Sequence, residues 1–592
     1  MNIIGFLGDY GGYMNREERN RITSDEYADL FITDHGRLSN IKFDGSFTTN
    51  VIDNNISVTH IPVFNITYNS LNIFGYEAMP KCFGLLSTPP SCHLLSLPLL
   101  NASNILTLRE IPGFQLEGEG VLVGFVDTGI DYMNPIFQYN NNTTKIVSIW
   151  DQTIPSEDNY PQGFYYGREF SREQINNALN SPNPLDIVPS TDEIGHGTVL
   201  AGVTAGSPQP DYGFIGIAPK AEIVAVKLKP AKPYLKEFFK IPEESICYQE
   251  NDIILGIKYL LHVAETLNRP IVICLGLGTS QGSHTGKGIL STYLTSVSRN
   301  PGVAVVVAGG NEGNRGRHYF KESESGDNLN FFDLNVGGNE KGFTMELWCL
   351  APNTVSLDVF PPTGEDIIHI PSITTKIDTI KVNYQDTQIL IDSHVREAGS
   401  GDQLIIVRFD HPISGTWRFR VEGKGTLPTK YHVWLPMDNF ITQGTFFLDP
   451  NNFTTLTAPG NSNFAIVVTA YNHINDTLFY NASNGFTANG FYKPDLAAPG
   501  INILSPVLNN EFARLTGTSL AAAHTAGIAA MILEWAIVRG NYPTINTNEM
   551  RNLFIKGARR CPDIPYPNEQ WGFGILDVFK TYVTLINEYY FR

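Results

Sequence analysis

Four polar residues, each within two positions of a glycine, could together carry out nucleophilic catalysis. Asp127 ends the apolar run VLVGFVD, His196 lies in EIGHGTVLAGVTAG, Asn311 follows VAVVVAGG, and Ser519 lies in LTGTSLAAAHTAGIAAMIL. A hydroxyl, an imidazole and a carboxylate can act as nucleophile, general base and orienting group. A side-chain amide, or the N–H groups at a helix start, can donate to a developing oxyanion.

Each of the four residues also has a plainer explanation. Asp127 and Ser519 could cap helices, Asn311 could occupy a turn, and His196 could be a buried structural histidine. All four plain explanations would have to hold together, in the order Asp, His, Asn, Ser, on one scaffold. Because motifs gain meaning from their mutual context, we favour the catalytic interpretation.

The elements around these residues predict a parallel sheet. The runs VLVGFVD, AEIVAVKL, PIVICLGLG and VAVVVAGG are apolar throughout, and they alternate with helical stretches such as NDIILGIKYLLHVAETLN. Continuous apolar strands separated by helices are typical of strands buried on both faces. Asp127 would lie at the carboxyl edge of that sheet, where open α/β sheets place their sites.

Composition excludes several function classes. The 592 residues include 41 Lys and Arg against 59 Asp and Glu, a formal net charge of −18, which disfavours binding to nucleic acid or anionic lipid. The longest apolar candidate, residues 521–538, is interrupted by His524 and Glu534, so no transmembrane span is expected. Six scattered cysteines lack zinc-ligand spacing and are expected to be free thiols.

The chain divides into four expected segments. Residues 1–95 form a small α+β unit, and residues 96–318 and 451–592 form the two parts of one α/β domain. Between them, residues 319–450 carry short alternating runs such as FTMELWCL and TWRFRVEG, which predict an inserted antiparallel β-sandwich. The N-terminus has no basic leader or apolar core of a signal peptide, so a cytoplasmic or spore-associated location is expected.

Four segments of the sequence resemble the signature segments of subtilisin-like serine proteases: DTGID, GHGT, AGGNEGN and GTSLAAAHTAG. The order Asp, His, Ser is also that family's order. The resemblance implies that Ser519 is the nucleophile, His196 the general base and then acid, and Asp127 the group that orients the imidazole. Asn311 and the backbone N–H of Ser519 would form the oxyanion hole.

The same resemblance implies the binding residues. Gly276, Leu277 and Gly278 would line one side of the specificity pocket, and Ala308, Gly309 and Gly310 the other, suited to an extended protein or peptide substrate. The sequence departs from the family at Val199, where a second histidine is usual, and at Ala522-Ala523, where Ser-Pro is usual. Neither departure removes a catalytic atom.

A narrower likeness is to the Csp germination proteases of clostridial spores and related gut bacteria. It rests on IWDQTIP, QENDI and GLGTSQGSHTG. It implies a subtilisin core with a jelly-roll insertion, and a prodomain that is removed by self-cleavage near STPPSCHLLSLPLL and is a binding partner of its own enzyme. The substrate would be the precursor of a spore-cortex hydrolase or another protein. No cofactor is required for the chemistry, and a structural calcium ion is allowed without assigned ligands.

Two other functions remain open on sequence alone. The chain could be a pseudoprotease that acts as a sensor or scaffold, although such relatives lose a catalytic side chain and this one retains all three. The β insertion could instead bind a ligand or carbohydrate, which exposed Trp417 or Trp434 would favour. Alternation along the strands places both tryptophans in a core.

Overall fold

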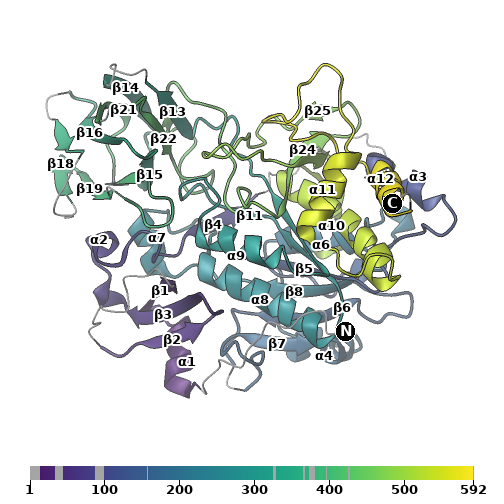
Figure 1. Cartoon of the computed structure of the whole chain (residues 1–592). Helices are drawn as coiled ribbons and strands as arrows, with labels where there is room; N and C mark the ends of the chain where they lie inside the picture. The colour runs from purple at the N-terminus through teal and green to yellow at the C-terminus, as the bar shows by residue number, and fades with distance from the viewer. Residues whose placement is uncertain are drawn as a thin grey trace.

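Three regions make up the molecule in the computed structural model (Figure 1). The structure describes residues 14–33, 45–86, 99–156, 158–323, 329–364, 367–372, 380–394, 396–424 and 427–590. An α/β body occupies the right of the view, an N-terminal module the lower left, and a module of two antiparallel sheets the upper left.

The α/β body is built on a nine-stranded sheet that is mostly parallel. Its path runs β25 (Thr477–Leu478), β24 (Ile466–Asn472), β12 (Val303–Ala308), β10 (Ile271–Leu275), β5 (Leu122–Asp127), β8 (Glu222–Lys227), β6 (Ile146–Asp151) and β7 (Arg168–Ser171), with β26 (Leu496–Pro499) beside β24. Only the end strands β25 and β7 pair antiparallel with their neighbours. The expected parallel sheet is therefore confirmed.

Helices cover both faces of this sheet, which explains why its strands are apolar throughout. Within β5, Val123 and Phe125 pack into one hydrophobic cluster, and Leu122 and Val126 pack into the other. The first face is covered by α6 (His196–Ala205), α10 (Thr518–Leu533), α11 (Thr547–Gly557) and α12 (Val578–Tyr590). The second face is covered by α8 (Glu250–Thr266) and α9 (Ile289–Val297).

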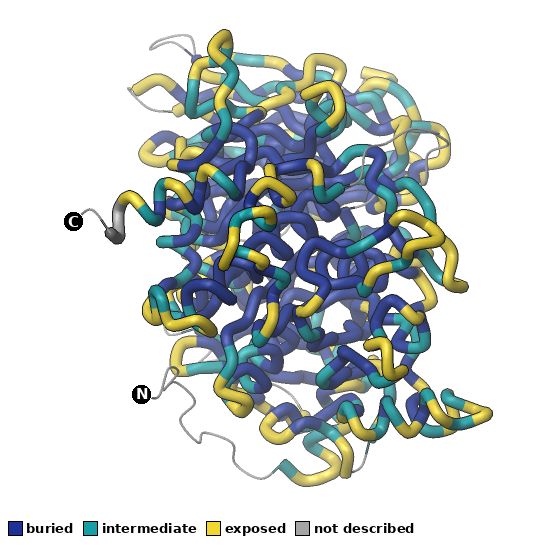
Figure 2. The backbone as a smooth tube through the Cα atoms, turned by 90° about the vertical axis from the view of Figure 1, so that its right-hand side faces the viewer, coloured by how far each residue is buried: buried dark blue, intermediate teal, exposed yellow. Residues whose placement is uncertain are grey.

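Helix α10 lies entirely inside the body. All of its residues are buried, and a Cβ on Gly527 would lie only 2.4 Å from Cβ of Ile217, so the small residues permit a very close approach. The segment Thr518–Val538 is long and apolar enough to cross a membrane, but 89% of its most apolar window is buried within the protein. Its composition is thus explained by packing, and Figure 2 shows the buried backbone continuing through the centre of the molecule.

The N-terminal module is a small α+β unit. Its three-stranded antiparallel sheet has the order β1 (Tyr27–Thr33), β3 (Ile56–Pro62), β2 (Thr48–Val51), accompanied by α1 (Arg16–Thr23) and α2 (Ser70–Phe74). Strand β4 (Cys82–Leu85) leaves this module and pairs with two strands of the body, β9 (Tyr248–Gln249) and β11 (Leu277–Gly278). The stretch 87–100, where self-cleavage was expected, lies outside the described residues except for its last two.

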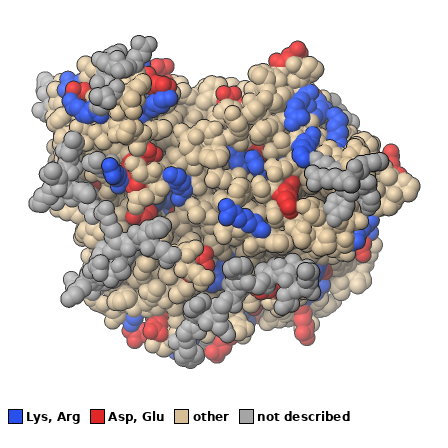
Figure 3. Space-filling view, viewed as in Figure 1, with Lys and Arg blue, Asp and Glu red and all other residues tan. Residues whose placement is uncertain are grey.

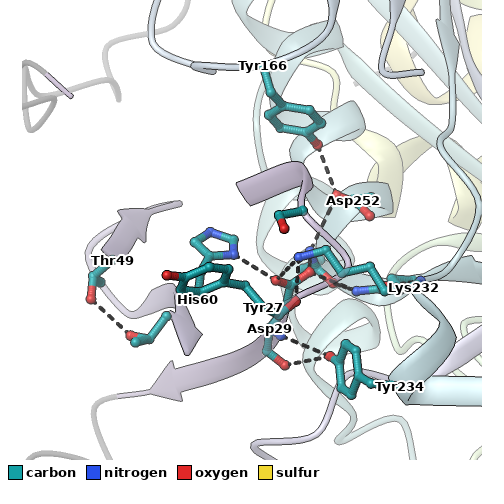
Figure 4. Close-up of polar contacts among 12 residues, drawn as sticks. Tyr27, Asp29, Thr49, His60, Tyr166, Lys232, Tyr234 and Asp252 are labelled. Carbon is teal, nitrogen blue, oxygen red and sulfur yellow. Dashed lines mark hydrogen bonds and ion pairs between the residues drawn. The ribbon is translucent and has the colours of Figure 1, made fainter. Parts of the chain in front are cut away.

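A buried polar cluster attaches the N-terminal module to the body (Figure 4). Asp29 of β1 forms an ion pair of 2.7 Å with Lys232 and a hydrogen bond of 2.7 Å with Nδ1 of His60. The hydroxyl of Tyr234 donates to the carbonyl of Asp29, and Gln249 donates to the carboxylate. Burial alone would raise the pKa of Asp29, but the positive charges of Lys232 and His60 hold it well below its usual value.

The third region consists of two antiparallel sheets that share one hydrophobic cluster. The first sheet has the order β13 (His318–Glu322), β22 (Lys430–Trp434), β15 (Gly342–Cys349), β20 (Gln403–Asp410), β19 (Thr387–His394), β18 (Ile380–Tyr384). The second has the order β17 (Ile368–Ile370), β16 (Thr354–Phe360), β21 (Gly415–Lys424), β14 (Leu329–Val336), β23 (Phe446–Phe447). Trp417 and Trp434 are both buried, so neither is exposed to bind a carbohydrate on the surface of this module.

Charged residues are scattered on the face shown in Figure 3. Lysines and arginines alternate with acidic residues there, and most of the surface is uncharged. Among the described residues, no group of three or more His, Cys, Asp or Glu side chains could hold a metal ion. Cys82, Cys247, Cys274 and Cys349 are buried free thiols, as expected, and Cys561 is half-buried.

Candidate active site

Asp127 and His196 are joined by a hydrogen bond at the carboxyl edge of the parallel sheet. Asp127 is the last residue of β5, and its Oδ1 lies 2.8 Å from Nδ1 of His196, the first residue of α6. The same oxygen accepts from the N–H of Thr128 at 2.8 Å. The carboxylate therefore fixes the orientation of the imidazole and directs Nε2 away from Asp127.

The pKa of His196 is raised above its ordinary value of 6.5. Burial opposes the charged form, but the negative charge of Asp127, its hydrogen bond and the charge of Asp192 outweigh that effect. These surroundings therefore favour the protonated form of the His196 imidazole.

Asp192 also holds the backbone that presents His196, a role that the sequence analysis missed. Its Oδ1 accepts from the N–H of Gly195, and its Oδ2 accepts from both the N–H and the hydroxyl of Thr198. Gly195 has a φ of 88°, a left-handed conformation that glycine adopts without strain. An acidic residue three positions before Gly195 was the available signal, because Asp favours such local bonds to backbone N–H groups.

Ser519 is the second residue of α10, where backbone N–H groups have no partner within the helix. Gly517 precedes the helix without a side-chain cap. Oγ of Ser519 and Nε2 of His196 are both buried, and neither has a hydrogen-bond partner within the described part of the chain. The two atoms are therefore hydrogen-bonded neither to each other nor to any other described group.

Gly276 shows that Ser519 and His196 converge. A Cβ placed on Gly276 would lie 2.9 Å from Cε1 of His196 and 3.1 Å from Cβ of Ser519. The two side chains therefore flank one point of the backbone between β10 and β11. A glycine at that position is needed because any side chain would clash with Leu200, His196 and Ser519.

Asn311 is held by the residue before Ser519. Its Oδ1 accepts from the N–H of Thr518 at 3.2 Å and from the hydroxyl of Thr518 at 2.9 Å. These two bonds occupy the amide oxygen and leave the amide NH₂ available as a donor beside the start of α10. The sequence analysis did not assign this positioning role to Thr518.

The residues expected to form pocket walls lie on two neighbouring segments. Leu277 and Gly278 form β11, while Ala308 ends β12 and is followed by Gly309 and Gly310. A Cβ on Gly278 would lie 2.4 Å from Oγ1 of Thr457, and a Cβ on Gly310 would lie 2.7 Å from the same atom. Thr457, which the sequence analysis missed, therefore fills the space between the two walls.

Strand β4 occupies the cleft beside this site. It lies between β9 and β11 and pairs antiparallel with both. The N–H of Leu86, just beyond β4, donates to the carbonyl of Gly276 at 3.0 Å. A segment of the N-terminal module thus adds a strand to this part of the body, and Leu86 bonds to the glycine that Ser519 and His196 flank.

Comparison with known proteins agrees with this arrangement. Residues 118–333 and 441–574 match the Subtilase family (Peptidase_S8), and the interruption falls on most of the two-sheet module. The chain belongs to the subtilase family. The expected resemblance to subtilisin-like proteases is thereby confirmed.

Among solved structures, this subtilase is similar to the CspB protease of Clostridium perfringens. The two share 30% sequence identity with a TM-score of 0.73, over 83% of this chain and 98% of the other. This likeness supports the narrower resemblance to the Csp subgroup.

Curated relatives are more distant and longer. The subtilase is 22% identical over 524 residues to the PII-type proteinase of Lacticaseibacillus paracasei and 23% identical over 517 residues to the subtilisin-like protease SBT3.8 of Arabidopsis thaliana. The matches cover 78% and 76% of this chain, but only 26% and 60% of those two proteins.

Proposed function

We propose that this subtilase is a serine endopeptidase that uses Ser519, His196 and Asp127 as its catalytic triad. The observation that carries the proposal is the hydrogen bond from His196 to Asp127, together with the convergence of His196 and Ser519 on Gly276. Ser519 would attack the substrate carbonyl while Nε2 of His196 takes its proton and later gives it to the leaving amine.

The oxyanion hole consists of the NH₂ of Asn311 and the N–H of Ser519. Both donors lie at the start of α10, whose positive dipole end favours negative charge. Donors fixed before the reaction stabilise the tetrahedral oxyanion without reorganisation cost.

The N-terminal module is a prodomain, and the chain is a zymogen that cleaves itself. Support comes from β4, which fills the cleft and would exclude any other extended substrate. The walls 276–278 and 308–310 bind the residues before the scissile bond. The two-sheet module is a jelly-roll-type insertion that stabilises the enzyme or orients its substrate. The physiological substrate is a protein, and the resemblance to Csp proteases points to a spore-cortex hydrolase precursor.

Intact-mass spectrometry of the wild type and Ser519→Ala tests the proposal. We expect the wild type to appear as an N-terminal fragment plus a mature body, and the variant to stay whole. If the wild type also stays whole, a serine-reactive fluorophosphonate probe decides. Absence of labelling at Ser519 would favour the pseudoprotease alternative.

A further inference from the structure

Leu86, the residue directly after β4, has its backbone bonded to the segment between β10 and β11. Its N–H donates to the carbonyl of Gly276, the same glycine that Ser519 and His196 flank. Leu86 is only 1% exposed. Its backbone is therefore held by a main-chain hydrogen bond to the same residue that Ser519 and His196 approach.

The side chain of Leu86 enters the space between the two pocket walls, 276–278 and 308–310. Its Cδ1 lies 3.0 Å from the place that a Cβ on Gly278 would take, and Cβ of Thr457 lies 2.9 Å from that same place. Thr457 also lies against Gly310 on the opposite wall. The pocket thus holds a medium-sized apolar side chain and is closed at its end by Thr457.

Gly84, two residues before Leu86, is contacted by two residues from the two-sheet module, Met437 and Phe440. A Cβ there would lie 3.1 Å from Sδ of Met437 and 3.2 Å from Cζ of Phe440. Gly84 does not have a positive φ, so its backbone conformation does not require glycine. Met437 and Phe440, which follow β22 of the two-sheet module, leave too little room for a side chain at this point of the strand. This lack of room is what favours glycine at position 84.

We propose that the chain cleaves itself after Leu86, and that the cleft selects glycine two residues before an apolar residue at the cut. This inference rests on the proposed function, and it specifies which residues the active site accepts before the scissile bond. It also gives the two-sheet module a specificity role, because residues beyond its strand β22 restrict the position that Gly84 occupies.

The cleavage step balances with water as the co-reactant. Oγ of Ser519 bonds to the carbonyl carbon of Leu86 as its proton moves to Nε2 of His196. The bond from that carbon to the next nitrogen breaks, and the nitrogen takes the proton from His196. Water then splits the ester, which leaves a carboxylate on Leu86 and restores the hydroxyl of Ser519.

The position of the cut is tested by intact mass and N-terminal sequencing of the wild type and Ser519→Ala. We expect a mature body that begins at Ser87 and a fragment that ends at Leu86, both absent from Ser519→Ala. Cleavage that needs Ser519 but falls at another bond would overturn this inference and leave the proposed function standing. Absence of any cleavage that needs Ser519 would overturn this inference as well, and labelling of Ser519 by the fluorophosphonate probe would then decide the proposed function.

Selectivity is tested by the time course of processing during cell-free translation. Overpacking at Gly84 predicts that Gly84→Val is processed at least about 10-fold more slowly than wild type, with Gly84→Ala much less affected. Leu86→Asp should also be slow and Leu86→Met near normal, because the pocket is apolar. Equal rates for Gly84→Val and wild type would refute the selection of glycine.

A second substitution separates steric exclusion from misfolding. Met437→Ala, combined with Gly84→Val, should restore much of the processing rate by making room for the added side chain. Thermal unfolding of Ser519→Ala with and without Gly84→Val reports whether the uncut chain folds. A folded Gly84→Val chain that Met437→Ala fails to rescue would contradict the role given to Met437.

Discussion

Lys232 and Asp29 form a fully buried ion pair that connects the catalytic body to the N-terminal module. Their charged atoms are 2.7 Å apart, and each side chain is at most 2% exposed. Asp29 has further partners in His60 and Gln249, which come from both sides of the interface (Figure 4). The attachment of the module therefore depends on a satisfied polar network as well as on apolar contacts.

Removing one charge of this pair should destabilise the chain strongly. In the uncut Ser519→Ala background, Lys232→Met is expected to lower the free energy of unfolding by about 3–5 kcal/mol, because the buried carboxylate of Asp29 would lose its lysine counter-ion. Denaturant unfolding measures the change. The matched control is Lys341→Met, which breaks the exposed pair with Glu244 and should leave the free energy of unfolding nearly unchanged. A similar small loss for Lys232→Met would contradict the finding.

The same pair predicts sensitivity to acid. The folded pKa of Asp29 lies well below the ordinary 3.8, so its carboxylate contributes stability that is present above that pH. That stability is lost as the pH falls below 3.8, because the unfolded chain takes up the proton first. Unfolding free energies measured between pH 6 and pH 3 should fall more steeply for the uncut chain than for its Asp29→Asn variant. Parallel curves would show that Asp29 does not contribute.

The raised pKa of His196 sets the acid limit of activity. Catalysis requires the neutral imidazole, so kcat/KM should decline as the pH falls through a value above 6.5. Asp192→Asn removes one of the charges that raise this pKa, and the midpoint should move to lower pH. Glu193→Gln is the control, since Glu193 is exposed and is not among the groups that shift His196. An unchanged midpoint for Asp192→Asn would exclude the charge effect.

Asn311 should affect the transition state more than substrate binding. Asn311→Ala removes a proposed oxyanion donor, and we expect kcat to fall by about 10²–10³-fold, a magnitude taken from the corresponding donor in subtilisin itself. KM for a peptide substrate should stay nearly constant. Since Asn311 also accepts from Thr518, the variant Thr518→Val separates positioning from donation. A larger loss in KM than in kcat would count against the oxyanion role.

The sequence by itself determined the sheet, its carboxyl edge and the four residues placed there. Apolar runs such as β5 and β12 are local signals, because a strand buried on both faces must be apolar along its whole length. Glycines beside Asp127, His196 and Ser519 mark close approaches in the same local way. These patterns lie within a few neighbouring residues, so they can be recognised without knowing which distant segment packs against them.

Only the tertiary structure decided which distant segments meet in the cleft. Leu86 pairs with Gly276, and Asp29 pairs with Lys232 across 203 positions of sequence. Short strands such as β4 have no periodic pattern that names their partner, because backbone pairing uses groups common to all residues. The contacts of Met437 and Phe440 with Gly84, and the position of Thr457 between the pocket walls, could not be predicted for the same reason. They depend on how separate elements fill one space, and that is settled by packing of the whole chain.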